Sequence, residues 1–290
     1  MTLLSRTSPS SPGVDAEGVV AFPDACADAP RYPGAVRAEL EGLMSGPVFA
    51  LVLVAAGLIG AFTGAFLNAV IERVSARTPT LRDDRRAAST LARRRLIALA
   101  TGAAFVGVTW WGIEEFVPTN GWWTVATIIV AYLYLAAVGI ALAIIDLETR
   151  RLPNPIVLSS YGVLATLLAA ACLFGAPWQA LLRAVAGGVV LFAFYALLRL
   201  IRPGGMGGGD VKLSGVLGGA LGWIGWGALA VGAFAAFLVG GLVGAALLLG
   251  RRATRTTAIA FGPFMILGAW IGIVVGGPIA EGYLGLIAVR

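Results

Sequence analysis

Two aspartates lie next to apolar segments of this chain, where burying a carboxylate is energetically unfavourable. Asp146 follows the apolar run 122–145, and Asp210 follows the glycine-rich stretch "PGGMGGG", residues 203–209. An ionisable side chain at membrane depth indicates a function by default, because its desolvation must be offset. When two carboxylates share a proton, the ionised one can take a proton from water while the neutral one hydrogen-bonds a substrate carbonyl. Such a pair can hydrolyse a peptide bond without a metal or a covalent intermediate.

Composition points to the same groups for acid-base chemistry. The 290 residues include no histidine, and the two cysteines, Cys26 and Cys172, form no CxxC pair. A Ser-His-Asp triad, a Cys-His pair and a histidine metal site are therefore excluded. We expect no metal and no cofactor.

The chain has the composition of an integral membrane protein. Charged residues make up 12% and hydrophobic residues 59%, whereas soluble domains carry about 25% charged residues. The net charge of +6 comes from arginines beside apolar runs, which indicates membrane orientation. Because the basic segment has no interleaved aromatic residues, we expect no nucleic-acid partner.

The residues alone also allow other roles for the two acids. Asp146 could form an ion pair with Arg150 or Arg151 at a membrane interface. Asp210 could cap a helix that begins at Val211, a common role for aspartate. Two acids on one side of a membrane would also suit a proton-coupled transporter.

The expected fold is an all-α polytopic membrane protein, a bundle of about seven or eight transmembrane helices behind a disordered tail, residues 1–46. A short helix is expected at 211–223, where 13 residues rise only about 20 Å. The longer spans are predicted at 47–71, 96–113, 122–145, 154–174, 180–201, 226–249 and 261–279.

The first span has one small and polar face. Gly60, Gly64 and Asn68 recur at every fourth position. This spacing predicts a helix-packing seam, with Asn68 as an interhelical hydrogen-bonding group.

Arginine counting predicts the orientation of the spans. The segment 73–95 holds eight arginines, and its excess of positive charge is typical of a cytoplasmic loop. If each span then crosses, including 211–223, sixteen of the 21 basic residues lie on the cytoplasmic side. This topology puts Asp146 and Asp210 together at the cytoplasmic face of the inner or plasma membrane, with the amino terminus outside.

Four motifs resemble a known family, the type IV prepilin peptidases, which are membrane aspartyl proteases of the GxGD type. "GMGGGDVKL", residues 205–213, is similar to the second catalytic motif, and "IDLETRRLPN", residues 145–154, to the first. "GAFLNAVIERV", residues 64–74, resembles the amino-terminal signature, and "FGPFMILGAW", residues 261–270, the carboxy-terminal segment.

The resemblance implies roles for individual residues. Asp146 and Asp210 fill the catalytic positions. Supporting motif positions that could contact substrate are Gly207, Gly209, Lys212, Pro153, Asn68, Gly262 and Pro263. Glu72 lies in the segment that resembles the amino-terminal signature and could belong to a polar site there, but its match to the family is too weak to assign it a catalytic role.

The implied activity is aspartic endopeptidase cleavage of the basic leader of prepilins or pseudopilins. Many members carry a cytoplasmic domain with paired CxxC motifs, linked to zinc and to methylation of the new amino terminus, but 73–95 has no cysteine. We therefore expect 47–95 to be a reduced amino-terminal region, namely a first helix and an arginine-rich loop, and 96–290 to be the peptidase membrane domain. A bifunctional peptidase and N-methyltransferase is the alternative, and the oligomeric state stays open. The glycines before Asp210 are expected to let the helix end move, so a substrate-free structure can hold the aspartates apart.

Overall fold

The computed structural model describes residues 46–75, 86–202, 206–250 and 260–288, and these residues form helices and short connections without strands. Seven of the helices are long and apolar enough to cross a membrane. The predicted all-α multi-pass fold is thereby confirmed, whereas nearly all of the predicted disordered tail lies outside the described residues. The helices are α2 (Pro47–Ser75), α3 (Arg86–Phe116), α4 (Trp122–Thr149), α5 (Asn154–Leu173), α6 (Trp178–Ile201), α7 (Gly208–Ile224), α8 (Trp226–Leu249) and α9 (Gly262–Ala288).

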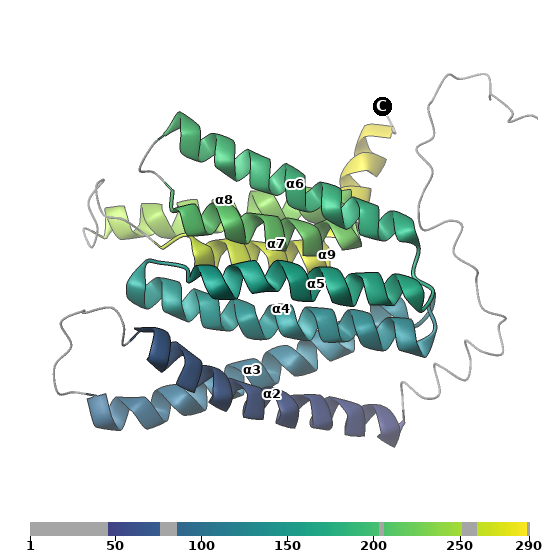
Figure 1. Ribbon diagram of the computed structural model, residues 1–290. Coiled ribbons are helices and arrows are strands. Elements are labelled where there is room, and N and C mark those ends of the chain that lie inside the picture. Colours follow the sequence, from purple (N-terminus) through teal and green to yellow (C-terminus); the bar gives the residue numbers. More distant parts are fainter. Residues whose placement is uncertain (1–45, 76–85, 203–205, 251–259, 289–290) are drawn as a thin grey trace, which may run out of the picture.

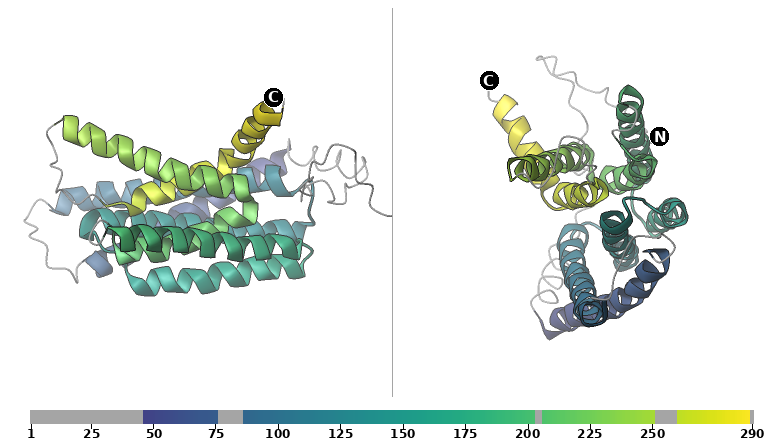
Figure 2. Two further views of the ribbon diagram at one scale, coloured as in Figure 1. Left: turned by 90° about the horizontal axis from the view of Figure 1, so that it is seen from above. Right: turned by 90° about the vertical axis from the view of Figure 1, so that its left-hand side faces the viewer.

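Consecutive helices pack as antiparallel pairs, and the pairs lie side by side in one bundle (Figure 1). Viewed nearly end-on, α2 and α3 occupy one edge of the bundle and α6, α8 and α9 the other (Figure 2, right). Helix α7 lies among its neighbours, and twelve of its 17 residues are buried. The predicted short, shielded helix is therefore present.

Contacts between helix termini define the two ends of the bundle. At one end, the start of α9 bonds to the end of α4 through Gly262 and Asp146. At the other end, the start of α6 bonds to the end of α7, since the Arg183 guanidinium donates to the carbonyls of Gly222 and Trp223 at 2.8 and 2.7 Å. Helix α7 therefore runs from the end that holds Asp146 to the opposite end, and α8 returns.

Small residues let the paired helices approach closely. A Cβ atom added to Gly218 of α7 would lie 2.5 Å from the carbonyl oxygen of Gly187 in α6. In α2, a Cβ on Gly60 or Gly64 would lie 2.8 Å from atoms of α3. The predicted packing seam of the first span is confirmed, and close backbone approach is the usual role of small residues at helix contacts in lipid.

Several helix ends differ from the prediction, among them the ends of α2 at Ser75 and of α4 at Thr149. Helix α3 begins at Arg86, so part of the expected loop 73–95 is helical, because alanine, leucine and arginine favour helix even where hydropathy is low. Helix α9 continues past 279 to Ala288. Helix α7 begins at Gly208, not Val211, because the N-terminal turn is stabilised by the side chain of Asp210.

Candidate active site

Asp146 lies in the last turn of α4 and is 4% exposed. The main-chain N–H of Gly262 donates a hydrogen bond to its Oδ2 atom at 3.0 Å. A Cβ atom on Gly262 would lie 2.7 Å from the same oxygen. The absence of a side chain at the start of α9 is what lets the two helices meet at this carboxylate.

The ion-pair alternative for Asp146 is wrong. Within the described residues neither Arg150 nor Arg151 forms an ion pair with Asp146, and the Arg150 main-chain N–H donates to the Asp146 carbonyl at 2.7 Å. The ion pairs found within the described part of the chain join Arg93 to Glu148 and Arg94 to Glu72. The Asp146 carboxylate faces α9 instead.

Asp210 lies in the first turn of α7 and is 8% exposed. The main-chain N–H of Gly207, the residue before the helix, donates to its Oδ2 atom at 3.2 Å. A negative side chain is also favourable next to the positive end of the helix dipole. The capping interpretation is correct in kind but misplaced, since Asp210 is the third helical residue and bonds back to Gly207. The hydrogen bond uses one of the two carboxylate oxygens, so it is compatible with a catalytic role.

The two carboxylates lie at the same end of the bundle, near enough for their charges to interact. Tyr195 of α6, whose side chain is 1% exposed, lies near enough to Asp210 to be affected by its charge. Two interacting carboxylates in a buried site can share one proton. The arrangement can supply a base and an acid at once.

The glycines around Asp210 leave room for specific neighbours. A Cβ on Gly209 would lie 2.7 Å from the Cβ of Leu152, and one on Gly207 would lie 3.1 Å from Asp210 Oδ2. Leu152 is the buried residue of the connection between α4 and α5, and Pro153 is the N-cap of α5. The first two motifs of the sequence therefore meet directly.

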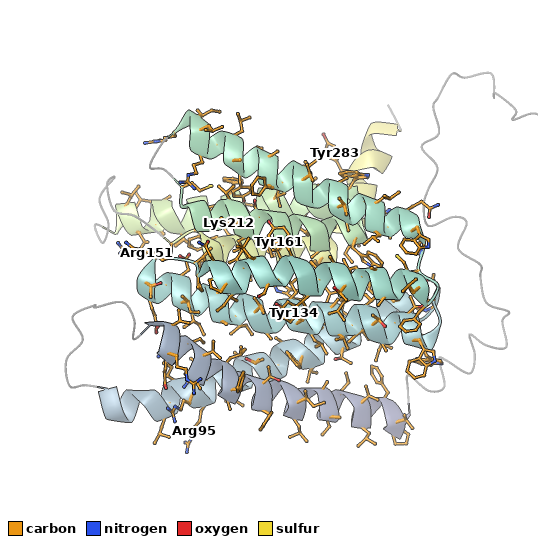
Figure 3. All side chains as sticks on the ribbon, viewed as in Figure 1. Arg95, Tyr134, Arg151, Tyr161, Lys212 and Tyr283 are labelled. Carbon is orange, nitrogen blue, oxygen red and sulfur yellow. The ribbon has the colours of Figure 1, made fainter. Side chains whose placement is uncertain are left out.

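Lys212 lies two residues beyond Asp210. Its Nζ atom donates to Asn154 Oδ1 at 2.9 Å, and its carbonyl accepts the Tyr161 hydroxyl at 2.6 Å. Figure 3 shows Lys212 and Tyr161 between the bodies of α5 and α7, with Arg151 at the same end of the bundle. Lys212 is thus a contact between helices.

An aromatic group borders the pair on the α6, α8 and α9 side. Tyr195 stacks on Phe237 with ring centroids 5.5 Å apart, and Phe237 lies 5.3 Å from Phe261. Phe261 directly precedes Gly262, while Pro263 fills the next position of α9, where its missing N–H is not needed. Tyr195 and Phe237 could not be identified from the sequence, because each lies in a long apolar run and belongs to no recognisable motif.

Asn68 belongs to a separate polar cluster. It is 1% exposed, and its Nδ2 atom donates to Glu72 Oε1 at 2.9 Å. Glu72 in turn accepts from Arg94 of α3 at 3.1 Å. The predicted interhelical hydrogen bonding of Asn68 is indirect, since it runs through Glu72 of the same helix to Arg94 of α3. The structure does not bring Asn68 to the two aspartates.

No group of three or more histidine, cysteine or acidic side chains with metal-binding geometry occurs in the residues that the structure describes. Cys172 is a free thiol, buried near the end of α5. Cys26 lies outside the described residues.

Comparison with known proteins confirms the predicted resemblance. Residues 133–249, which contain both aspartates, match the model of the type IV leader peptidase family. A protein of Aeromonas salmonicida (strain A449) named prepilin leader peptidase/N-methyltransferase is 32% identical over 203 residues, or 69% of this chain and 64% of that protein. Proteins of the same name from Pseudomonas aeruginosa and Bacillus subtilis (strain 168) are each 34% identical over half of this chain, covering 49% and 55% of their own lengths. The chain spans less than two thirds of these relatives, and no solved structure matches it.

Proposed function

We propose that this protein is a membrane aspartic endopeptidase that removes the basic leader of type IV prepilin-like proteins, with Asp146 and Asp210 activating water. The observation that carries the proposal is that two buried carboxylates, 64 residues apart in sequence, lie at one end of the bundle near enough for their charges to interact. The names of the similar proteins supply the substrate class.

The proposed reaction needs only the two acids, water and the substrate. The ionised carboxylate takes a proton from water as the water oxygen attacks the scissile carbonyl carbon. The neutral carboxyl group donates its proton toward the carbonyl oxygen, forming a tetrahedral diol. The carboxyl group that took the proton from water then gives it to the leaving nitrogen as the C–N bond breaks. The other carboxylate takes a proton from one diol hydroxyl as the new C=O forms, which releases a carboxylic acid and an amine and leaves one proton on the pair.

We place the site at the cytoplasmic face of the inner or plasma membrane, with the amino terminus outside. The support is the distribution of basic residues. Arg93, Arg94, Arg150 and Arg151 lie at or beside the helix ends near the aspartates, whereas Arg183 lies at the opposite end of α7. Cytoplasmic ends of membrane helices carry such an excess.

In terms of domains, we assign the peptidase to 96–290 and a reduced amino-terminal region to 47–95. The match to the family model falls inside the first of these segments. The names of the relatives also include N-methyltransferase, which favours a bifunctional enzyme as the second candidate. The short segment 73–95 without cysteine favours peptidase activity alone.

Mass spectrometry of the products tests the proposal and the second candidate together. Purified protein in detergent is incubated with prepilin-like substrates that carry a basic leader, a glycine and an apolar helix, with and without S-adenosylmethionine. A leader peptide and a mature chain with a free amino terminus are expected in both cases. If no substrate is cut, the proposed function is wrong; a methylated terminus would establish the bifunctional enzyme.

A further inference from the structure

We infer that Lys212 and Asn154 are positioning residues that set the distance between the two aspartates. Asn154 is the last residue of a strap, defined here as residues 150–154, which follows α4 and contacts the first turns of α7 through Leu152 and Asn154. The inference rests on the proposed function for its catalytic consequence. The contacts themselves stand on the structure alone.

Hydrogen bonds fix the conformation of the strap where it follows α4. Arg150 has a φ of 51°, the left-handed conformation, and its N–H donates to the Asp146 carbonyl at 2.7 Å. The Thr149 hydroxyl lies 2.8 Å from the Ile145 carbonyl, which accepts its proton, and 3.0 Å from the Arg151 carbonyl, and it accepts the Arg151 N–H at 3.3 Å. These bonds tie the start of the strap to the turn that carries Asp146.

The far end of the strap is held by α7. Leu152 is buried and packs where Gly209 has no side chain. Two residues on, Asn154 accepts the hydrogen bond of Lys212 at 2.9 Å. The apolar contact, at Gly209, therefore precedes Asp210 in the sequence, and the polar contact, at Lys212, follows it.

A further contact extends the same face of α7. The Tyr161 hydroxyl reaches the Lys212 carbonyl at 2.6 Å and passes directly against Gly215. Gly209, Lys212 and Gly215 are spaced by three residues, so they share one helix face, and this face meets the strap and α5. Contacts with α5 and the strap thereby fix the position of the helical turn that holds Asp210.

The chemistry of the Lys212 contact indicates a mechanical role. The side chain that accepts its hydrogen bond is a neutral amide, and Lys212 is the only lysine of the chain. A misplacement of about 1 Å can cost about 100-fold in rate, so a carboxylate pair carried on two helices needs such a tie. Loss of the tie should lower kcat, because the chemical step needs both acids, and should leave KM nearly unchanged.

The experiment uses four changes in the full-length protein: Lys212→Met, Asn154→Leu, both together, and the exchange Lys212→Asn with Asn154→Lys. Each single change is expected to lower kcat about tenfold with KM within about twofold. The double change should be no worse than the weaker single variant, because both remove one interaction. The exchange should recover most of the activity. Arg95→Met, which removes an exposed cation from α3, is the matched control.

Hydrogen exchange gives a readout that does not depend on cleavage. Faster amide exchange is expected at 207–213 and 150–156 in both single variants, with α8 and α9 unchanged. Single variants with wild-type kcat, additive effects, or exchange that rises throughout the protein would each overturn the inference. If the wild-type protein cuts no prepilin, the proposed function fails, and the exchange pattern still decides whether the strap holds α7.

Discussion

Replacing Gly262 by alanine is expected to displace the Asp146 carboxylate and to slow cleavage. The added Cβ atom would lie 2.7 Å from Oδ2 and 3.3 Å from Cγ of Asp146, whereas ordinary contact begins at 3.4 Å. Asp146 cannot keep its present place, because the helix end that carries Gly262 packs against it and donates the 3.0 Å hydrogen bond. The carboxylate must retreat by about 0.7 Å or turn away from the main-chain N–H.

The size of the effect follows from this displacement. A shift of about 1 Å in a reacting group can cost about 100-fold, and a hydrogen bond to a charged group contributes about 1.5–3 kcal/mol. We therefore expect kcat of Gly262→Ala to fall about 10- to 100-fold. Overpacking of a well-filled site costs about 1–3 kcal/mol of stability, which should leave the protein folded.

The assay is cleavage of a purified prepilin in detergent, followed by gel separation of precursor and mature forms over time. Gly107→Ala serves as the matched control, because a Cβ at Gly107 in α3 would meet no atom within 4 Å. Thermal unfolding of both variants separates a local effect from a loss of fold. A Gly262→Ala protein that cuts at the wild-type rate would refute the role assigned to this contact.

Three further substitutions test the packing, and chelation of metal ions tests the chemistry. Gly209→Ala, whose Cβ would lie 2.7 Å from that of Leu152, should lower kcat, and adding Leu152→Ala should restore part of it; no recovery would contradict the contact. Gly218→Ala should destabilise the α6–α7 pair by about 1–3 kcal/mol, seen as a lower Tm than Gly107→Ala. Arg183→Met should cost about 1–3 kcal/mol, because it leaves two carbonyls at the end of α7 without their donor, and an unchanged Tm would argue against that cap. Chelation by EDTA should leave the cleavage rate unchanged; a rate that falls and returns with added metal would contradict hydrolysis by two carboxylates.

Much of the architecture could be predicted from the sequence, because a membrane protein must bury its backbone polar groups in long apolar helices. Asp146 and Asp210 could be assigned to one end of the bundle by arginine counting alone, and the structure places them there. The predicted helix boundaries were less accurate, because they were placed where arginines lower the hydropathy, whereas a helix can continue through charged residues. Helix α3 continues through Arg93 and Arg94, whose charges are neutralised by Glu148 and Glu72.

Other parts of the site could not be predicted, because they depend on how helices distant in sequence pack. The N–H of Gly262 reaches Asp146 from 116 residues away. Tyr195 reaches the same site from an apolar run in which nothing distinguishes it. Lys212 and Asn154 belong to two motifs that the sequence analysis names, but nothing in the sequence indicates that their side chains bond to each other.

The central claim is that the two aspartates perform the hydrolysis. Its most direct test is the initial rate of prepilin cleavage by purified Asp146→Asn and Asp210→Asn proteins, beside Glu114→Gln, which makes the same chemical change in α3, where Glu114 accepts a hydrogen bond from Trp110. Each aspartate variant is expected to fold and to lose at least about 1,000-fold in rate, because loss of one acid removes general acid-base catalysis worth about 10²–10⁴-fold and the shared proton with it. Glu114→Gln should cut at the wild-type rate. Near wild-type cleavage by either aspartate variant would contradict the proposed mechanism.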